Sequence, residues 1–205
     1  EIKTISSNKF EEATIIAVSK KKPIENIEPL INYGHKHFGE NKVQEAISKW
    51  TDVKKKNNDL KLHMVGKLQS NKVKEALNLF DYIHSVDTAK LANKISQHQK
   101  LLKIKPKIFI QINIGEESQK SGINPKDLKE FLYLCKNKLS LEVLGLMCLP
   151  PINKSPKKYF QKMQDLKKEF NLCSLSMGMT SDYLEALNFN SSFLRIGTKI
   201  FGARD

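Results

Sequence analysis

The segment that most constrains the fold is 14–20, with the sequence Thr-Ile-Ile-Ala-Val-Ser-Lys. Its first five residues are apolar or β-branched, so the segment has almost no polar face. This pattern is typical of a strand buried on both faces, as in parallel sheets covered by helices. The segment ends in Ser19 and Lys20, and Pro23 suits the first turn of a following helix. Because α/β proteins place their chemistry at the carboxyl ends of such strands, Lys20 is a candidate functional residue. The alternative is that Lys20 only begins a solvated run, since two further lysines follow.

The composition is ordinary for a soluble globular protein. Of the 205 residues, 40% are apolar and 28% are charged, and we expect residues 1–205 to form a single domain. No apolar run approaches the roughly 20 residues that span a bilayer, and the chain has no signal-peptide segment at its start. The 3 cysteines lack CxxC spacing, so we expect neither a disulfide framework nor a cysteine metal site. These features predict a cytoplasmic protein with no metal and no membrane partner.

The net charge of +13 raises the question of a nucleic-acid partner. The charge is nearly all lysine, and Arg195 and Arg204 are the only arginines. The lysines are scattered over every segment rather than gathered in one stretch. We therefore expect no specific nucleic-acid partner, although loose binding of polyanions at low salt would follow from the charge. A nucleic-acid binder remains an alternative class.

Eight strand-like segments alternate with helical patterns along the chain. The expected strands are 14–20, 37–41, 62–66, 82–86, 107–113, 141–149, 173–177 and 193–197. The expected helices are 23–32, 43–50, 70–77, 88–101, 125–136, 155–170 and 182–187. Strict alternation without repeats or linkers predicts an α/β fold, a single (β/α)8 TIM-type barrel. A doubly wound open sheet is the alternative.

Polar residues collect at the expected carboxyl ends of the strands, which share one face of a barrel. The seventh and eighth ends are the most informative. The turn 176–182 combines glycine and hydroxyl residues, and Arg195 is followed by Gly197 and Thr198. Two such turns side by side are typical of the phosphate-binding loops of barrels. The strand-end residues are Lys20, Asn41, His63, Ser85, Asn113, Met147, Ser176 and Arg195.

A phosphate site opposite a strand-end lysine suggests a phosphorylated aldehyde held as a Schiff base, and pyridoxal 5'-phosphate is the obvious candidate. Lys20 would have to lose its proton, which desolvation or a neighbouring cation favours. Arg195 could reach the pyridine nitrogen. Because an arginine does not give up its proton, that nitrogen would stay unprotonated, and the ring would be a weaker electron sink.

At this point the residues resemble a known family. The matching motifs include Ala17–Lys20, His37–Asn41, Leu68–Lys72, His84–Asp87 and Arg195–Asp205. Ser118–Gly122, Gly145–Met147 and Ser176–Met179 match as well. In colinear order, from about residue 13 to the end, the chain resembles the pyridoxal phosphate homeostasis protein family.

The resemblance implies a barrel like the alanine racemase N-terminal domain, with Lys20 as the Schiff-base lysine. It also implies further cofactor-binding residues, each with its own role. Two departures from the family pattern are visible: Thr180 stands where serine is usual, and most of the helix before the first strand is missing. By this resemblance, Ser176, Gly197 and Thr198 would bind the phosphate, and Arg195 would face the pyridine nitrogen. Asn41 and His63 would line the cofactor, and Met177 would offer a backbone N–H to it.

The resemblance implies a non-enzymatic carrier for vitamin B6 homeostasis, with no catalytic residues, that could pass the cofactor to apo-enzymes. The alternative is a weak amino-acid racemase. Racemisation needs a second base, and alanine racemases take it from a second domain that we do not expect here. We expect a monomer. His35, His37, His84 and His98 are interpreted as structural or surface residues, because none has metal-ligand spacing. The tyrosines that could serve as a second base are Tyr33, Tyr82, Tyr133, Tyr159 and Tyr183.

Overall fold

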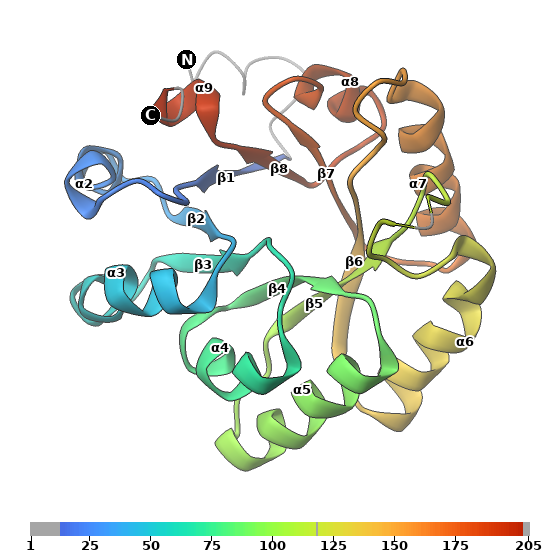
Figure 1. Ribbon diagram of the computed structural model, residues 1–205, viewed down its shortest axis with the longest axis horizontal. Helices are drawn as coiled ribbons and strands as arrows, with labels where there is room; N and C mark the ends of the chain where they lie inside the picture. The colour runs from blue at the N-terminus through green and yellow to red at the C-terminus, as the bar shows by residue number, and fades with distance from the viewer. Residues whose placement is uncertain (1–12, 118, 203–205) are drawn as a thin grey trace.

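The computed structural model describes residues 13–117 and 119–202. Eight parallel strands form a closed barrel in which each strand pairs with the next and β8 pairs with β1. Helices surround the strands, as Figure 1 shows in a view down the shortest axis. The predicted (β/α)8 barrel is confirmed, and the open-sheet alternative is excluded. Two sequence-based expectations fall outside the described residues. They are the shortened helix before the first strand and the last three residues, 203–205, of the motif that begins at Arg195.

The strands are short, as in most barrels of this kind. They are β1 (Thr14–Val18), β2 (His37–Glu40), β3 (Lys61–Met64), β4 (Tyr82–Val86), β5 (Lys107–Ile112), β6 (Glu142–Cys148), β7 (Ser174–Met179) and β8 (Phe193–Ile196). The α-helices are α2 (Glu28–Asn32), α3 (Val43–Lys56), α4 (Val73–Leu79), α5 (Ala89–Leu102), α6 (Leu128–Tyr133), α7 (Lys157–Glu169), α8 (Tyr183–Asn188) and α9 (Thr198–Phe201). Short 3₁₀ turns precede α2, α4 and α6 at Ile24–Asn26, Ser70–Lys72 and Pro125–Asp127, and a π turn, Leu134–Lys138, follows α6.

Several boundaries differ from the sequence prediction, and the change at the seventh strand bears on the site. The helix expected at 125–136 is divided into a 3₁₀ turn, α6 and the π turn. The seventh strand, expected to end at Met177, continues to Met179. The pairing of β7 with β8 shifts register between Ser176 and Met179, as at a β-bulge. Ser176 is therefore in the middle of a strand rather than at its end.

Side chains of β1 alternate between the two sides of the barrel wall. Ile15 and Ala17 pack toward the helices in the main hydrophobic core. Ile16 belongs to the smaller cluster inside the barrel, and Val18 packs against that cluster. The same alternation turns Ser19 toward α3 and Lys20 toward the barrel axis. The other members of the inner cluster are Tyr82, Phe109, Met147 and Phe193.

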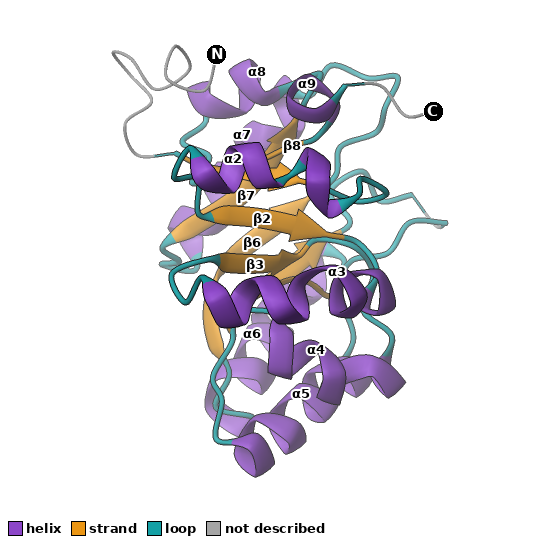
Figure 2. Cartoon of the chain, turned by 90° about the vertical axis from the view of Figure 1, so that its left-hand side faces the viewer, coloured by secondary structure: helices purple, strands orange, loops and turns teal. Residues whose placement is uncertain are grey.

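The side view in Figure 2 shows the strands running in one direction, with loops at both ends of the barrel. No helix in the described part of the chain is long and apolar enough to cross a membrane. The loops at the carboxyl ends of the strands carry most of the residues singled out by the sequence, and they surround a cavity.

Candidate functional site

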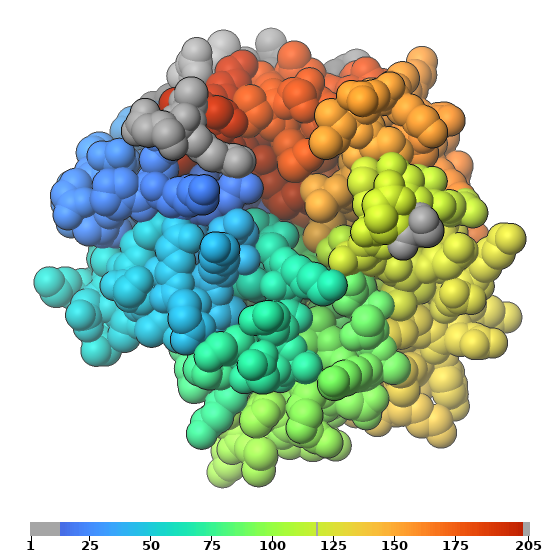
Figure 3. All heavy atoms as spheres, in the orientation of Figure 1, coloured from blue at the N-terminus to red at the C-terminus, as the bar shows by residue number. Residues whose placement is uncertain are grey.

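A cavity of about 580 Å³ lies at the carboxyl ends of the strands. Five of the eight predicted site residues line it: Lys20, Asn41, Arg195, Gly197 and Thr198. They lie at or just after the carboxyl ends of β1, β2 and β8, so segments from both ends of the described chain meet at one site. In Figure 3 the lime-coloured loop after β5 projects toward the viewer, so this view looks onto the carboxyl-end face. The cavity is within the range of about 300–1,000 Å³ that is usual for small-molecule sites.

Lys20 enters the cavity from the end of β1 through a tight turn. The N–H of Lys22 donates to the carbonyl of Ser19 at 3.1 Å. Lys21, between them, has a φ of 61°, in the left-handed region that non-glycine residues seldom occupy. This turn sends the chain away from the barrel directly after Lys20. Lys22 also lines the cavity, so two lysines face the same space.

Arg195 is held in place by two hydrogen bonds inside the barrel. Its side chain is almost entirely buried, with 5% of the residue exposed. Nη1 donates to Ser176 Oγ at 2.7 Å, and Nη2 donates to the carbonyl oxygen of Cys148 at 2.8 Å. Burial lowers the pKa of the guanidinium from its usual value, but an arginine keeps its proton in proteins. A guanidinium has five N–H donors, so the two bonds leave donors for a ligand in the cavity.

A line of three imidazoles runs from Ser176 away from the cavity. His84 Nδ1 is 2.9 Å from Ser176 Oγ, and His84 Nε2 is 2.9 Å from His63 Nδ1. His63 Nε2 is in turn 3.0 Å from His37 Nδ1. The rings of His63 and His84 stack on Tyr82 and Phe109, with centroids 4.2 and 4.4 Å apart. We call His37, His63 and His84 the histidine chain.

The charge on Arg195 sets the direction of the hydrogen bonds in the histidine chain. Ser176 Oγ accepts from Arg195, so its own proton is available to His84 Nδ1. If His84 accepts that proton, its Nε2 donates to His63 Nδ1 and His63 Nε2 donates to His37 Nδ1, in keeping with the distances of 2.9 and 3.0 Å. Burial lowers the pKa of His63 and His84 well below the usual value and that of His37 to about 4. The histidine chain is therefore neutral at pH 7.

Three of the predicted site residues lie below the cavity instead of lining it. His63 is fully buried and has both ring nitrogens bonded within the histidine chain. Ser176 is also fully buried, and its hydroxyl is taken by Arg195 and His84. The side chain of Met177 packs in the main hydrophobic core, between the barrel and the helices, and its backbone N–H donates to Ser191 Oγ at 3.4 Å. The cofactor-binding roles expected for these three residues stay predictions, and in this structure their polar groups bond to other residues of the chain.

Thr180 and Ser181 line the cavity and were missed as site residues. The extra length of β7 brings them to the place predicted for Ser176. Asp182 closes the turn, because its Oδ1 accepts from the N–H of Met179 at 2.6 Å. Gly178 has a φ of 91°, and a Cβ there would lie 2.7 Å from the Cβ of Ala186. The sequence did indicate a turn rich in hydroxyl residues at 176–182. Which of those residues face the cavity depends on where β7 ends, and the sequence pattern did not show that.

Asn41 carries an unsatisfied polar atom at the cavity. Its Oδ1 is buried and has no hydrogen-bond partner among the described residues. Gly66 packs against the backbone of Asn41 so closely that a Cβ would lie 2.3 Å from its carbonyl oxygen. Ser85 holds Gly66 in turn, by donating from Oγ to its carbonyl at 2.6 Å. A buried oxygen without a partner is costly, and a donor on a bound ligand would satisfy it.

The cavity therefore combines amines, a buried guanidinium, an unsatisfied amide oxygen and two turns that carry hydroxyl groups. No group of three His, Cys, Asp or Glu residues in the described part of the chain could hold a metal ion. This donor set fits a small anionic molecule with a carbonyl group and a ring acceptor, which are the features of pyridoxal phosphate. The fold and the site together define a cofactor-binding barrel of the alanine racemase type, and residues 2–205 match the family described as alanine racemase, N-terminal domain.

The chain belongs to the family of pyridoxal phosphate homeostasis proteins. It is 36% identical over 201 residues to the pyridoxal phosphate homeostasis protein of Aquifex aeolicus, and the match covers 94% of this chain and 87% of that protein. PipY of Synechococcus elongatus, solved without PLP, is 33% identical with a TM-score of 0.90, and 98% of each chain is covered. The structure of PipY with PLP bound gives a TM-score of 0.88.

An alanine racemase of Clostridium difficile shares the fold. It is 16% identical with a TM-score of 0.77, and the match covers 99% of this chain but 56% of the racemase. Proteins of the two kinds thus have the same barrel, and the similarity to the racemase concerns the fold alone.

Proposed function

We propose that this protein binds pyridoxal 5'-phosphate at the carboxyl-end cavity and serves in cofactor homeostasis. The observation that carries the proposal is the meeting of Lys20 and Arg195 in one cavity below the turns of β7 and β8. The relatives named pyridoxal phosphate homeostasis protein and the PLP-bound structure of PipY support it. When bound, the cofactor supplies an aldehyde that condenses with an amine and a pyridine ring that accepts electron density.

Lys20 provides the amine, because it lies at the end of β1 and faces the cavity. Arg195 has N–H donors beyond those bonded to Ser176 and Cys148, and one of these would bind the ring nitrogen of the ligand. Asn41 Oδ1 has no partner among the described residues and would accept from a hydroxyl group of the ligand. The turns that contribute Thr180, Ser181, Gly197 and Thr198 line the same cavity, and they would hold the phosphate.

The same site favours a carrier over an amino-acid racemase. Racemisation requires a second proton donor on the far side of the substrate carbon, and no tyrosine is among the described residues that line the cavity. Tyr82 is inside the barrel against His63, and Tyr159 and Tyr183 are buried in the main hydrophobic core. Tyr33 and Tyr133 are exposed, at 62% and 56%. We therefore propose that the protein holds the cofactor and passes it to apo-enzymes without significant turnover. The alternative is a weak racemase.

Two assays separate the carrier from the racemase. The protein loaded with pyridoxal phosphate is mixed with an apo-enzyme that needs the cofactor, and the recovered activity is followed. The loaded protein is also incubated with L-amino acids, which are then separated by chiral chromatography. We expect recovery of the apo-enzyme and no racemisation. Racemisation at about 1 per second or faster, lost in Lys20→Ala, would make the protein an enzyme.

A further inference from the structure

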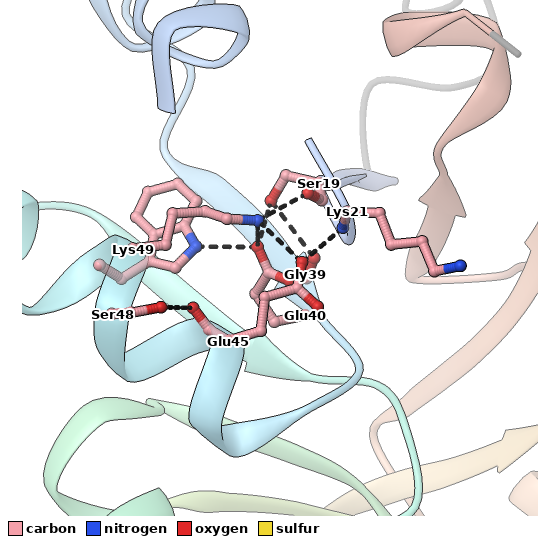
Figure 4. Close-up of polar contacts among 8 residues, drawn as sticks. Ser19, Lys21, Gly39, Glu40, Glu45, Ser48 and Lys49 are labelled. Atoms are coloured by element: carbon pink, nitrogen blue, oxygen red, sulfur yellow. Dashed lines mark hydrogen bonds and ion pairs between the residues drawn. The ribbon is translucent and has the colours of Figure 1, made fainter. Parts of the chain in front are cut away.

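A polar cluster, buried at Glu40 and partly exposed at Glu45, lies directly behind Lys20 on the helix side of the barrel wall. It consists of Ser19, Glu40, Glu45, Lys49 and Trp50, and we call it the Glu40 cluster; Figure 4 shows its polar contacts. Glu40 Oε1 accepts three hydrogen bonds: from Ser19 Oγ at 2.8 Å, Lys49 Nζ at 2.8 Å and Trp50 Nε1 at 2.9 Å. Glu40 has no exposed surface, and the side chain of Lys49 is 8% exposed. None of these residues lines the cavity.

The Glu40 cluster holds the peptide groups on both sides of Lys20. The carbonyl of Ser19, which precedes Lys20, accepts from Lys49 Nζ at 2.9 Å. The N–H of Lys21, which follows Lys20, donates to Glu45 Oε1. Lys49 joins the two sides, because its Nζ also donates to Glu45 Oε1 at 3.2 Å. The backbone of Lys20 is thus fixed from behind by two side chains of α3, while its own side chain faces the cavity.

A gain in folding stability does not explain why the Glu40 cluster contains buried charged groups. Removing a carboxylate and an ammonium from water costs several kcal/mol per ion, and a well-packed apolar pair is often as stable. The second oxygen of the Glu40 carboxylate, Oε2, is buried and has no partner among the described residues. The cluster also restrains Lys21 with its positive φ of 61°, and strained backbone of this kind is often kept at functional sites.

We propose that Lys49, with Glu40 and Glu45, is a positioning residue that holds the backbone of Lys20 so that its amine reaches the aldehyde carbon of pyridoxal phosphate. The inference rests on the proposed function, since it needs Lys20 as the attachment point. In the step concerned, the neutral amine forms a bond to the aldehyde carbon, and the aldehyde oxygen leaves as one water with both protons of the amine. No oxidant or reductant is needed.

The test compares two lysines of the same helix. Lys49→Met removes the ammonium that joins the two sides of Lys20. Lys54→Met is the matched control, because Lys54 also forms an ion pair, to Asp81 Oδ2 at 2.7 Å, and also donates to a carbonyl, that of Leu79 at 2.8 Å. Apo-protein is mixed with pyridoxal phosphate, and the covalent link is followed by stopped-flow absorbance and by intact mass after borohydride reduction.

We expect Lys49→Met to slow formation of the link roughly 10- to 100-fold, since a displacement of about 1 Å has an effect of this size. Lys54→Met should react at the parent rate. Non-covalent affinity is measured separately in the Lys20→Ala background, where adding Lys49→Met should change the Kd by less than about twofold, because the rest of the cavity is intact. Equal rates for the parent and Lys49→Met, or equal slowing by both lysine variants, would overturn the positioning role and leave the proposed function standing.

A second pair of variants covers the case in which Lys49→Met does not fold. Glu45→Ala removes the acceptor for the N–H of Lys21, whereas Glu45→Gln keeps a carbonyl oxygen at that place. We expect slow attachment in the alanine variant and recovery toward the parent rate in the glutamine variant. Identical rates in both would contradict the inference. Failure of the parent itself to form any link would overturn the proposed function, and the positioning role with it.

Discussion

The histidine chain predicts a steep loss of stability in mild acid. The pKa of His63 and His84 is well below the usual value because both rings are buried, and that of His37 is about 4. In the unfolded chain each histidine titrates near 6.5. Below that pH the unfolded state therefore binds more protons than the folded state. The free energy of unfolding is highest above about pH 6.5 and falls as the pH drops toward the folded pKa values.

The size of the loss follows from the two fully buried rings. Each contributes at most about 1.4 kcal/mol per pH unit, so His63 and His84 together remove up to about 3 kcal/mol between pH 6.5 and pH 5. His37 is only partly buried, so solvent screening makes its contribution smaller. Because a domain of this size has about 5–15 kcal/mol of stability, the loss is a large fraction of the total.

Urea denaturation at a series of pH values from 7.5 to 5 measures this effect. His84→Gln should reduce the slope of unfolding free energy against pH by about 1.4 kcal/mol per unit, even though it also lowers the overall stability. His98→Gln, on α5 and outside the histidine chain, is the matched control substitution. A parent slope below about 1 kcal/mol per unit between pH 6 and pH 5, where the two rings together predict more than twice that, would refute the reasoning.

Other substitutions test the assignments around the cavity. Thr198→Ala should lose a hydrogen bond to the phosphate dianion and about 1.5–3 kcal/mol of cofactor binding, measured by titration. Ser176→Ala should affect affinity less than Thr198→Ala does. It should lower the melting temperature, because Arg195 loses its acceptor and a buried polar network is broken. A larger affinity loss in Ser176→Ala than in Thr198→Ala would indicate that Ser176 binds the phosphate. Gly178→Ala should cost about 1–3 kcal/mol of stability, because φ is 91° and the added Cβ meets Ala186; an unchanged melting curve would contradict this.

The sequence predicts the barrel well because its signal is local. Alternation of apolar strands such as Thr14–Val18 with amphipathic helices requires only the pattern of neighbouring residues. Lys20, Asn41, Arg195, Gly197 and Thr198 were placed at the cavity because each ends or directly follows a strand. Strand ends share one face in any parallel barrel, so no tertiary information was needed.

The sequence does not indicate how deep within the barrel a strand residue lies. Ser176 and His63 have the polar side chains expected of site residues, but they lie inside the barrel, where strand stagger sets the height of each side chain. β7 ends two residues later than expected, and its pairing with β8 shifts register between Ser176 and Met179. A bulge of this kind depends on pairing with β8, which the pattern of a single segment does not contain. The histidine chain was missed as a unit for the same reason, since it joins β2, β3 and β4.

The central claim is that Lys20 is the residue to which pyridoxal phosphate attaches. Lys22 lines the same cavity, so the experiment must identify which of the two lysines is modified. The protein is incubated with pyridoxal phosphate, reduced with borohydride, digested and mapped by mass spectrometry. The account predicts one pyridoxyl group on Lys20, absent after substitution Lys20→Ala. Modification of Lys22 instead, or no stable modification in the cavity, would contradict it.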